Sequence, residues 1–162
     1  MEQKSFNHLL LKTAFSCMAC DGEIDNKEIE VIRRMHAEKN IFGNINLNEE
    51  LNKMVAQINT EGQGFLKQYF QDLTNANLPE SDELKIVETA IETIKADDKI
   101  EYSEIKFFKV IKSKLKISND LIMNVHPDFE EYLEDDIISP TYLSTIQSDF
   151  FSSYSISEFK IS

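Results

Sequence analysis

Acidic side chains recur at fixed spacing in two short segments that lie 76 positions apart. The first segment is Cys20–Glu28 and the second is Ala96–Glu104. Carboxylate oxygens are the ligands that Ca²⁺ and Mg²⁺ prefer in proteins. The two segments therefore supply the candidate metal ligands of this sequence, which are Asp21, Asp25, Glu28, Asp97, Asp98, Glu101 and Glu104.

The same carboxylates could instead serve the ends of helices. Each segment follows one apolar-periodic stretch and precedes another, so it forms the elbow of a helical hairpin. Asp25 can cap the next helix, with Glu28 completing a capping box, and Asp21 or Asp97 can accept backbone N–H bonds within its turn. A cap stabilises a helix by roughly 0.5–2 kcal/mol, so capping would explain the pattern without a ligand. Both interpretations stay open at this point.

The spacing within the elbows is not that of an EF-hand. An EF-hand loop places a bidentate Glu at position 12, whereas Glu28 is the eighth residue counted from Asp21. A looser site would use turn carbonyls as well as side chains. It would be stronger if the two elbows met in space.

Catalysis has little support in the sequence. Paired carboxylates can act as acid and base, but surface elbows offer no desolvation to separate their pKa values. The common hydrolase, zinc-protease, P-loop and dinucleotide-binding patterns do not occur. We therefore expect a protein that is not an enzyme.

The two cysteines, Cys17 and Cys20, have the C-x-x-C spacing of redox and zinc sites. They lie inside an apolar-periodic helix, however, and His8, His36 and His126 show no ligand spacing. A structural zinc would therefore lack half of its four ligands. We expect buried helix cysteines that behave as small hydrophobic residues.

Apolar side chains at steps of three and four residues predict the helices. Asn46 and Glu49 predict a further capping box, and Gly62 and Gly64 predict a break. The helices are expected at about 2–20, 25–38, 46–58, 65–73, 80–96, 102–115 and 118–125. The first two match the fifth and sixth across the offset, with apolar residues in both at Leu10/Ile86, Leu11/Val87, Phe15/Ile91, Met18/Ile94, Ile29/Ile105 and Met35/Ile111.

At its paired turns the chain resembles the tellurite-resistance TerB-like family. Members are all-helical and have two related halves, each with a turn of the form A-D-G-x-I-x-x-x-E. Cys20 replaces the Ala of the first turn here, and Asp98 replaces the Gly of the second. The resemblance covers about residues 6–116. It implies a compact bundle of about seven helices, no established catalysis, an acidic metal-binding surface and a role in bacterial stress response.

The charge of the chain is uneven. Lys and Arg total 17 against 29 Asp and Glu, which gives a net charge of −12. Residues 117–162 hold one Lys and nine acidic residues. This field would repel nucleic acid and attract cations or a basic protein surface. No apolar run reaches the ~18–20 residues of a membrane span, and no secretory signal begins the chain, so we expect a cytoplasmic protein with a protein partner.

We predict an all-α fold in which two pseudo-duplicated helical hairpins build a TerB-like domain over residues 1–126. Residues 127–162 form an acidic C-terminal extension rich in Ser and aromatic residues, which we expect to pack on the domain or on a partner. The predicted function is that of a non-enzymatic stress-response protein of the tellurite-resistance type, with Ca²⁺ or Mg²⁺ bound at the elbows. The alternative is a protein–protein interaction or scaffold module that uses its acidic surface and aromatic C-terminal segment.

Overall fold

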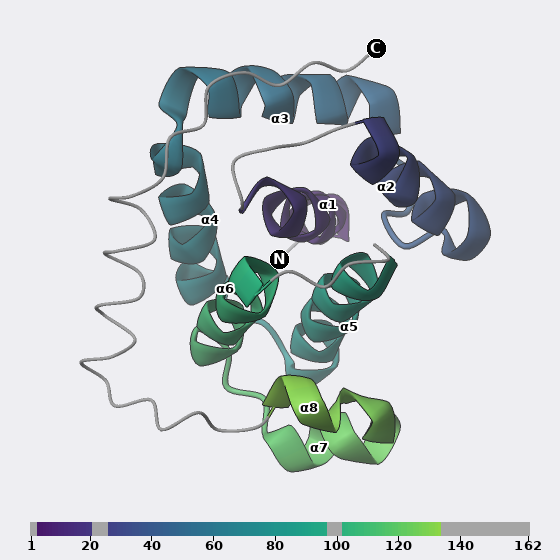
Figure 1. Cartoon of the computed structure of the whole chain (residues 1–162), viewed down its shortest axis with the longest axis vertical. Helices are drawn as coiled ribbons and strands as arrows, with labels where there is room; N and C mark the ends of the chain where they lie inside the picture. The colour runs from purple at the N-terminus through teal and green to yellow at the C-terminus, as the bar shows by residue number, and fades with distance from the viewer. Residues whose placement is uncertain (1–2, 21–25, 97–101, 134–162) are drawn as a thin grey trace.

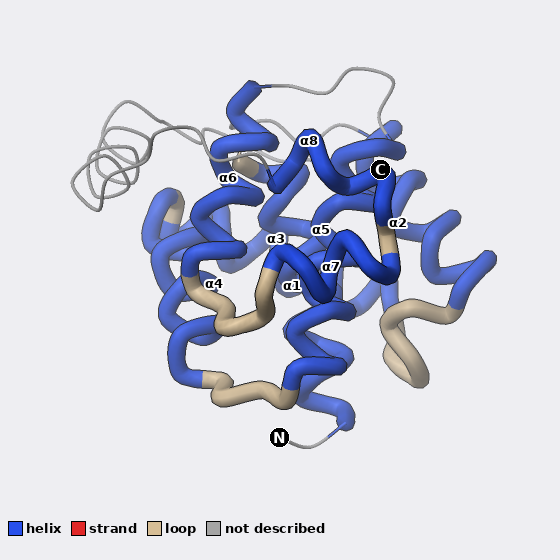
Figure 2. The backbone as a smooth tube through the Cα atoms, turned by 90° about the horizontal axis from the view of Figure 1, so that it is seen from below, coloured by secondary structure: helices blue, strands red, loops and turns tan. Residues whose placement is uncertain are grey.

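The computed structural model describes residues 3–20, 26–96 and 102–133. Within these ranges the chain consists of helices and loops and has no strand, which confirms the predicted all-α class (Figures 1 and 2). The helices are α1 (Gln3–Ala19), α2 (Asn26–Lys39), α3 (Leu47–Glu61), α4 (Gln63–Asn75), α5 (Glu80–Ala96), α6 (Tyr102–Ser113), α7 (Asn119–Val125), the 3₁₀ turn η1 (Pro127–Phe129) and α8 (Glu130–Leu133).

Helix α1 lies at the centre of the bundle, and helices α2 to α6 surround it (Figure 1). Every residue from Leu9 to Cys20 is buried, including Lys12, Thr13 and Ser16. A helix that is apolar on nearly all sides is stable only where other elements cover all of those sides. Helix α5 is its most extensive neighbour.

The paired apolar positions of the two predicted hairpins lie in one core. Leu10, Phe15 and Met18 of α1 are buried, as are their counterparts on α5. Ile105 is the exception, because it is half-buried whereas its counterpart Ile29 is buried. The periodic pattern therefore identified the faces on which α1 and α5 pack together.

Local signals set several helix ends. The Asn46 side chain accepts a hydrogen bond of 3.2 Å from the backbone N–H of Glu49, as the capping pattern predicted. Gly62, at φ +58°, ends α3, and its N–H donates to the carbonyl of Ile58. Gly64 lies inside α4, so the break occurs at Gly62 alone.

The segment after α7 packs on the bundle. Phe129 and Leu133 belong to the hydrophobic core, and α8 contacts α6. Lys95 Nζ donates to Asp128 Oδ2 at 2.7 Å and lies 5.2 Å from the centre of the Phe129 ring. The first residues of the predicted extension, 127–133, thus contribute Phe129 and Leu133 to the core. Residues 134–162 lie outside the described ranges.

Candidate functional site

The structure describes two of the seven candidate metal ligands. Asp21, Asp25, Asp97, Asp98 and Glu101 lie outside the described residues. The separation of their carboxylates therefore stays untested, as does the capping role of Asp25. The two described candidates are Glu28, which ends the motif of the first elbow, and Glu104, which ends that of the second.

Glu28 and Glu104 both lie in the first turn of a helix. Glu28 opens α2 and is half-buried, whereas Glu104 opens α6 and is only 7% exposed. Each takes part in an interaction with a neighbour. Carboxylates in a first helical turn interact favourably with the positive end of the helix dipole, so this placement agrees with a structural role and leaves a ligand role open.

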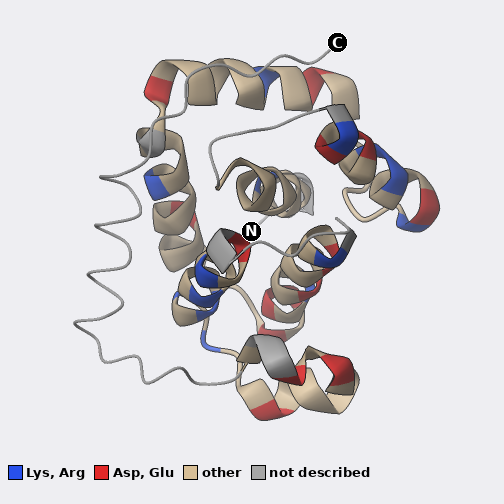
Figure 3. Cartoon of the chain, in the orientation of Figure 1, with Lys and Arg blue, Asp and Glu red and all other residues tan. Residues whose placement is uncertain are grey.

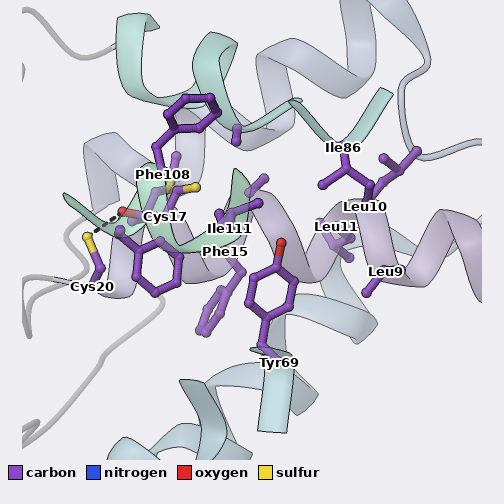
Figure 4. Packing of buried hydrophobic residues seen from close by; sticks show 14 of the residues in the cluster. Leu9, Leu10, Leu11, Phe15, Cys17, Cys20, Tyr69, Ile86, Phe108 and Ile111 are labelled. Carbon is purple, nitrogen blue, oxygen red and sulfur yellow. Dashed lines mark hydrogen bonds between the residues drawn. The ribbon is translucent and has the colours of Figure 1, made fainter. Parts of the chain in front are cut away.

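The helix ends beside the two elbows meet at one end of the bundle. The carboxylate of Glu104, at the start of α6, lies close enough to Cys17, near the end of α1, to raise the pKa of its thiol. Burial contributes even more to that rise. Figure 4 shows Cys17 beside Phe108, one helical turn beyond Glu104. The helix that enters the first elbow therefore touches the helix that leaves the second.

Among the described residues no three His, Cys, Asp or Glu side chains are arranged to hold a metal ion. Glu28 and Glu104 could supply at most a fraction of the six to eight oxygens that Ca²⁺ takes. A site at this end of the bundle would thus depend on the aspartates of the elbows themselves.

The two cysteines are free and buried, as predicted. Cys20 Sγ donates to the carbonyl oxygen of Cys17 at 3.1 Å (Figure 4). The raised pKa keeps Cys17 as a neutral thiol, and the thiolate is the form that attacks or binds a metal. The pair therefore packs as small hydrophobic side chains.

The three histidines lie apart, each against a different neighbour. His8 Nε2 is 3.3 Å from Glu50 Oε2, and the His36 ring stacks on Phe42. The ring of His126 stacks on Phe129 with centroids 4.4 Å apart. No two of them share a neighbour among these contacts.

Two polar contacts between α1 and α4, one buried and one part-buried, were missed by sequence reasoning. Lys12 Nζ donates to Asp72 Oδ2 at 3.0 Å and lies 4.9 Å from the centre of the Phe65 ring. The Thr13 hydroxyl is 2.7 Å from the Tyr69 hydroxyl and also donates to the Leu9 carbonyl. Because a threonine hydroxyl has one proton, Tyr69 is the donor in the pair. These contacts fix α4 on the central helix.

Glu83 makes a further buried polar contact that sequence reasoning missed. Its Oε1 accepts hydrogen bonds from the backbone N–H groups of Lys116 (3.0 Å) and Ile117 (2.8 Å). The carboxylate thereby holds the start of α5 to the segment after α6. The acceptor and its donors lie more than thirty residues apart, so no local signal could reveal the contact.

Comparison with protein-family models, with curated proteins and with solved structures found no match to this chain. In the described part of the chain, no helix combines the length and the apolar character that crossing a bilayer requires.

Proposed function

We propose that this chain is a non-enzymatic TerB-like protein of the stress-response type, and that it binds a divalent cation at the end of the bundle where the helix ends beside its acidic elbows meet. The observation that carries the proposal is the position of Glu104. This carboxylate belongs to the second elbow, is almost fully buried and acts electrostatically on Cys17, near the end of the helix that enters the first elbow.

The chemistry of this end of the bundle supports a hard cation. The two elbows carry eight carboxylates between them, of which seven are the predicted ligands, and mutual repulsion of carboxylates weakens a fold unless cations or donors compensate for it. Carboxylates together with turn carbonyls form the all-oxygen environment that Ca²⁺ and Mg²⁺ select. Either ion would offset the negative charge that the two elbows carry.

The buried nucleophiles support the non-enzymatic part of the proposal. Burial raises the pKa of both the Cys17 thiol and the Tyr69 hydroxyl, so both groups stay protonated at neutral pH. A catalytic nucleophile needs an adjacent base or a lowered pKa. Neither group has a lowered pKa, since burial shifts both in the opposite direction.

Thermal unfolding with and without cation tests the proposal. Saturating Ca²⁺ or Mg²⁺, at about 100 times its Kd, adds ~2.7 kcal/mol of stability, which corresponds to a rise in Tm of roughly 5–10 °C for a chain of this size. The double variant Asp21→Asn plus Asp97→Asn should lose that rise.

The matched control removes two carboxylates elsewhere. Asp120→Asn plus Glu61→Gln changes the net charge by the same amount at exposed positions, and it should keep the full cation effect. Absence of a shift in the unmodified chain at millimolar cation would overturn the proposal. An equal shift in the elbow variant would also do so, because the ion would then bind elsewhere.

The charge of the outer C-terminal helices favours a second candidate, an interaction module. Asp120, Asp128 and Glu130 are exposed, and residues 117–133 contain no Lys or Arg (Figure 3). A basic partner surface would complement this region. The double variant Asp120→Asn plus Glu130→Gln removes two exposed charges of this region, so loss of a co-purifying partner with unchanged Tm would support this candidate, and retention of the partner would argue against it.

A further inference from the structure

A groove of about 290 Å³ lies between the N-terminal half of α1, the loop after α2 and one face of α5. Its lining combines apolar side chains with both signs of charge. The lining includes Phe6, Leu10, Ile41, Lys85, Glu88 and Glu92. We propose that this groove binds a small zwitterion with an apolar side chain, of which a free apolar α-amino acid is the simplest example.

The groove lies at a face of α5 that no described helix covers in the way that α4 packs on the matching face of α1. Across the 76-residue offset, Lys12 and Ser16 of α1 correspond to Glu88 and Glu92 of α5. Lys12 pairs with Asp72 of α4 and its side chain is only 11% exposed, and Ser16 is fully buried. The side chains of Glu88 and Glu92 stay 33% and 31% exposed. The face of α5 that matches the α4-binding face of α1 is thus left open toward the groove.

The wall opposite α5 is fixed in place by two contacts. Gly43 adopts φ +66°, and a Cβ added there would overlap Nδ2 of Asn7, so the loop lies tightly against α1. Lys39 Nζ donates to Glu92 Oε1 at 2.7 Å and joins the end of α2 to α5. A groove with fixed walls loses less entropy when a ligand binds.

Two opposite charges on α5 remain available to a ligand. Lys85 forms none of the ion pairs found among the described residues. Glu88 Oε2 lies 3.2 Å from Nε2 of His126, but this nitrogen makes no aligned hydrogen bond. Lys85 can therefore meet a carboxylate, and Glu88 can accept hydrogen bonds from an ammonium group.

The size and the lining of the groove select the class of ligand. Its volume is at the lower limit of the roughly 300–1,000 Å³ typical of ligand pockets, so it suits a small metabolite. Phe6, Leu10 and Ile41 offer apolar surface to a side chain. A ligand with only one charge would leave either Lys85 or Glu88 without a partner, which lowers its affinity relative to a zwitterion.

The test is an NMR titration of the full chain with L-leucine and L-phenylalanine. We expect saturable shifts at the backbone amides of residues 6–10, 39–43 and 85–92. N-acetyl-L-leucine lacks the ammonium group and L-leucinamide lacks the carboxylate, so each should bind at least about tenfold more weakly.

Variants on α5 distinguish binding in this groove from nonspecific binding elsewhere on the chain. Lys85→Gln and Glu88→Gln should each weaken L-leucine binding about tenfold, whereas Lys53→Gln, at an exposed position of α3, should not. Failure to saturate at millimolar amino acid would overturn the inference. Equal binding of the two blocked analogues, or affinity that both α5 variants leave unchanged, would overturn it as well.

Discussion

Helices α1 and α5 carry the same apolar pattern, yet one is central and the other is peripheral. The apolar positions that match across the offset are buried in both helices, including the small pair Ala14 and Ala90. Two matched polar positions differ. Lys12 and Ser16 are buried under neighbouring helices, whereas Glu88 and Glu92 remain partly exposed. The matched apolar residues thus pack α1 and α5 into one core. The exposure of these two polar positions shows that neighbouring helices cover the remaining sides of α1 but leave those of α5 partly exposed.

A second correspondence lies at the beginning of the two helices. Asn7 and Glu83 occupy matching positions, and both are buried. Asn7 lies against Gly43 in the loop after α2, while Glu83 accepts hydrogen bonds from Lys116 and Ile117 after α6. In each half a polar side chain near the start of the first helix therefore holds the segment that follows the second helix. This likeness supports the proposed relation between the halves.

The largest expected effect comes from truncating the matched core residues. Phe15→Ala should lower the free energy of unfolding by about 3–5 kcal/mol and Ile91→Ala by about 2–5 kcal/mol, because both side chains are fully buried. Urea unfolding measures both values. A cost below about 1 kcal/mol at either position would show that the two helices do not share one core, because such a value is typical of surface substitutions.

The next largest loss of stability is expected when Glu83, the counterpart of Asn7, is replaced. Glu83→Ala leaves two backbone N–H groups without their acceptor and should cost about 1–3 kcal/mol. Glu83→Gln keeps an acceptor oxygen and should cost clearly less. Equal unfolding midpoints for the two variants would contradict the role of the Glu83 carboxyl group as an acceptor.

A smaller effect, visible at alkaline pH, distinguishes Cys17 from Thr93, its counterpart on α5. Burial raises the pKa of Cys17 in the folded chain above the ordinary value of 9.0, so only the unfolded chain releases the proton between about pH 9 and 10. The free energy of unfolding is therefore unaffected below the unfolded pKa and falls as the pH rises above it, with a slope that approaches about 1.4 kcal/mol per pH unit.

Cys17→Ala removes this titration and serves as the comparison. The variant should lose less stability than the unmodified chain between pH 9 and 10, measured by urea unfolding at each pH. Parallel pH profiles for the two proteins would show that the Cys17 thiol ionises equally in both states, which contradicts its burial.

Features that depend on local sequence could be predicted, and features that depend on distant partners could not. The helix bounds, the Asn46 cap and the burial of both cysteines follow from periodicity and spacing within one segment. The burial of Lys12 depends on Asp72, sixty residues away, and that of Glu83 depends on backbone groups after α6. Apolar periodicity identified Ile105 as a core residue, but it is half-buried because neighbouring helices cover that face only in part.

The candidate site could be predicted only in outline. The two acidic elbows could be identified in the sequence. The structure adds that the helix ends beside them lie close together, with Glu104 of α6 near Cys17 of α1. The groove on α5 had no sequence signal, because its walls come from α1, the loop after α2 and α5. A site assembled from three separate segments depends on tertiary packing, which the periodicity of a single helix does not encode.

The central claim is that the two elbows share one cation, and paramagnetic broadening by Mn²⁺ tests it most directly. Mn²⁺ favours the same oxygen ligands as Mg²⁺ and Ca²⁺. In ¹H–¹⁵N spectra, substoichiometric Mn²⁺ should broaden the amide signals of Cys20 and Glu104 together, and Asp21→Asn plus Asp97→Asn should abolish this broadening. Broadening at one elbow alone, or at neither, would contradict the claim.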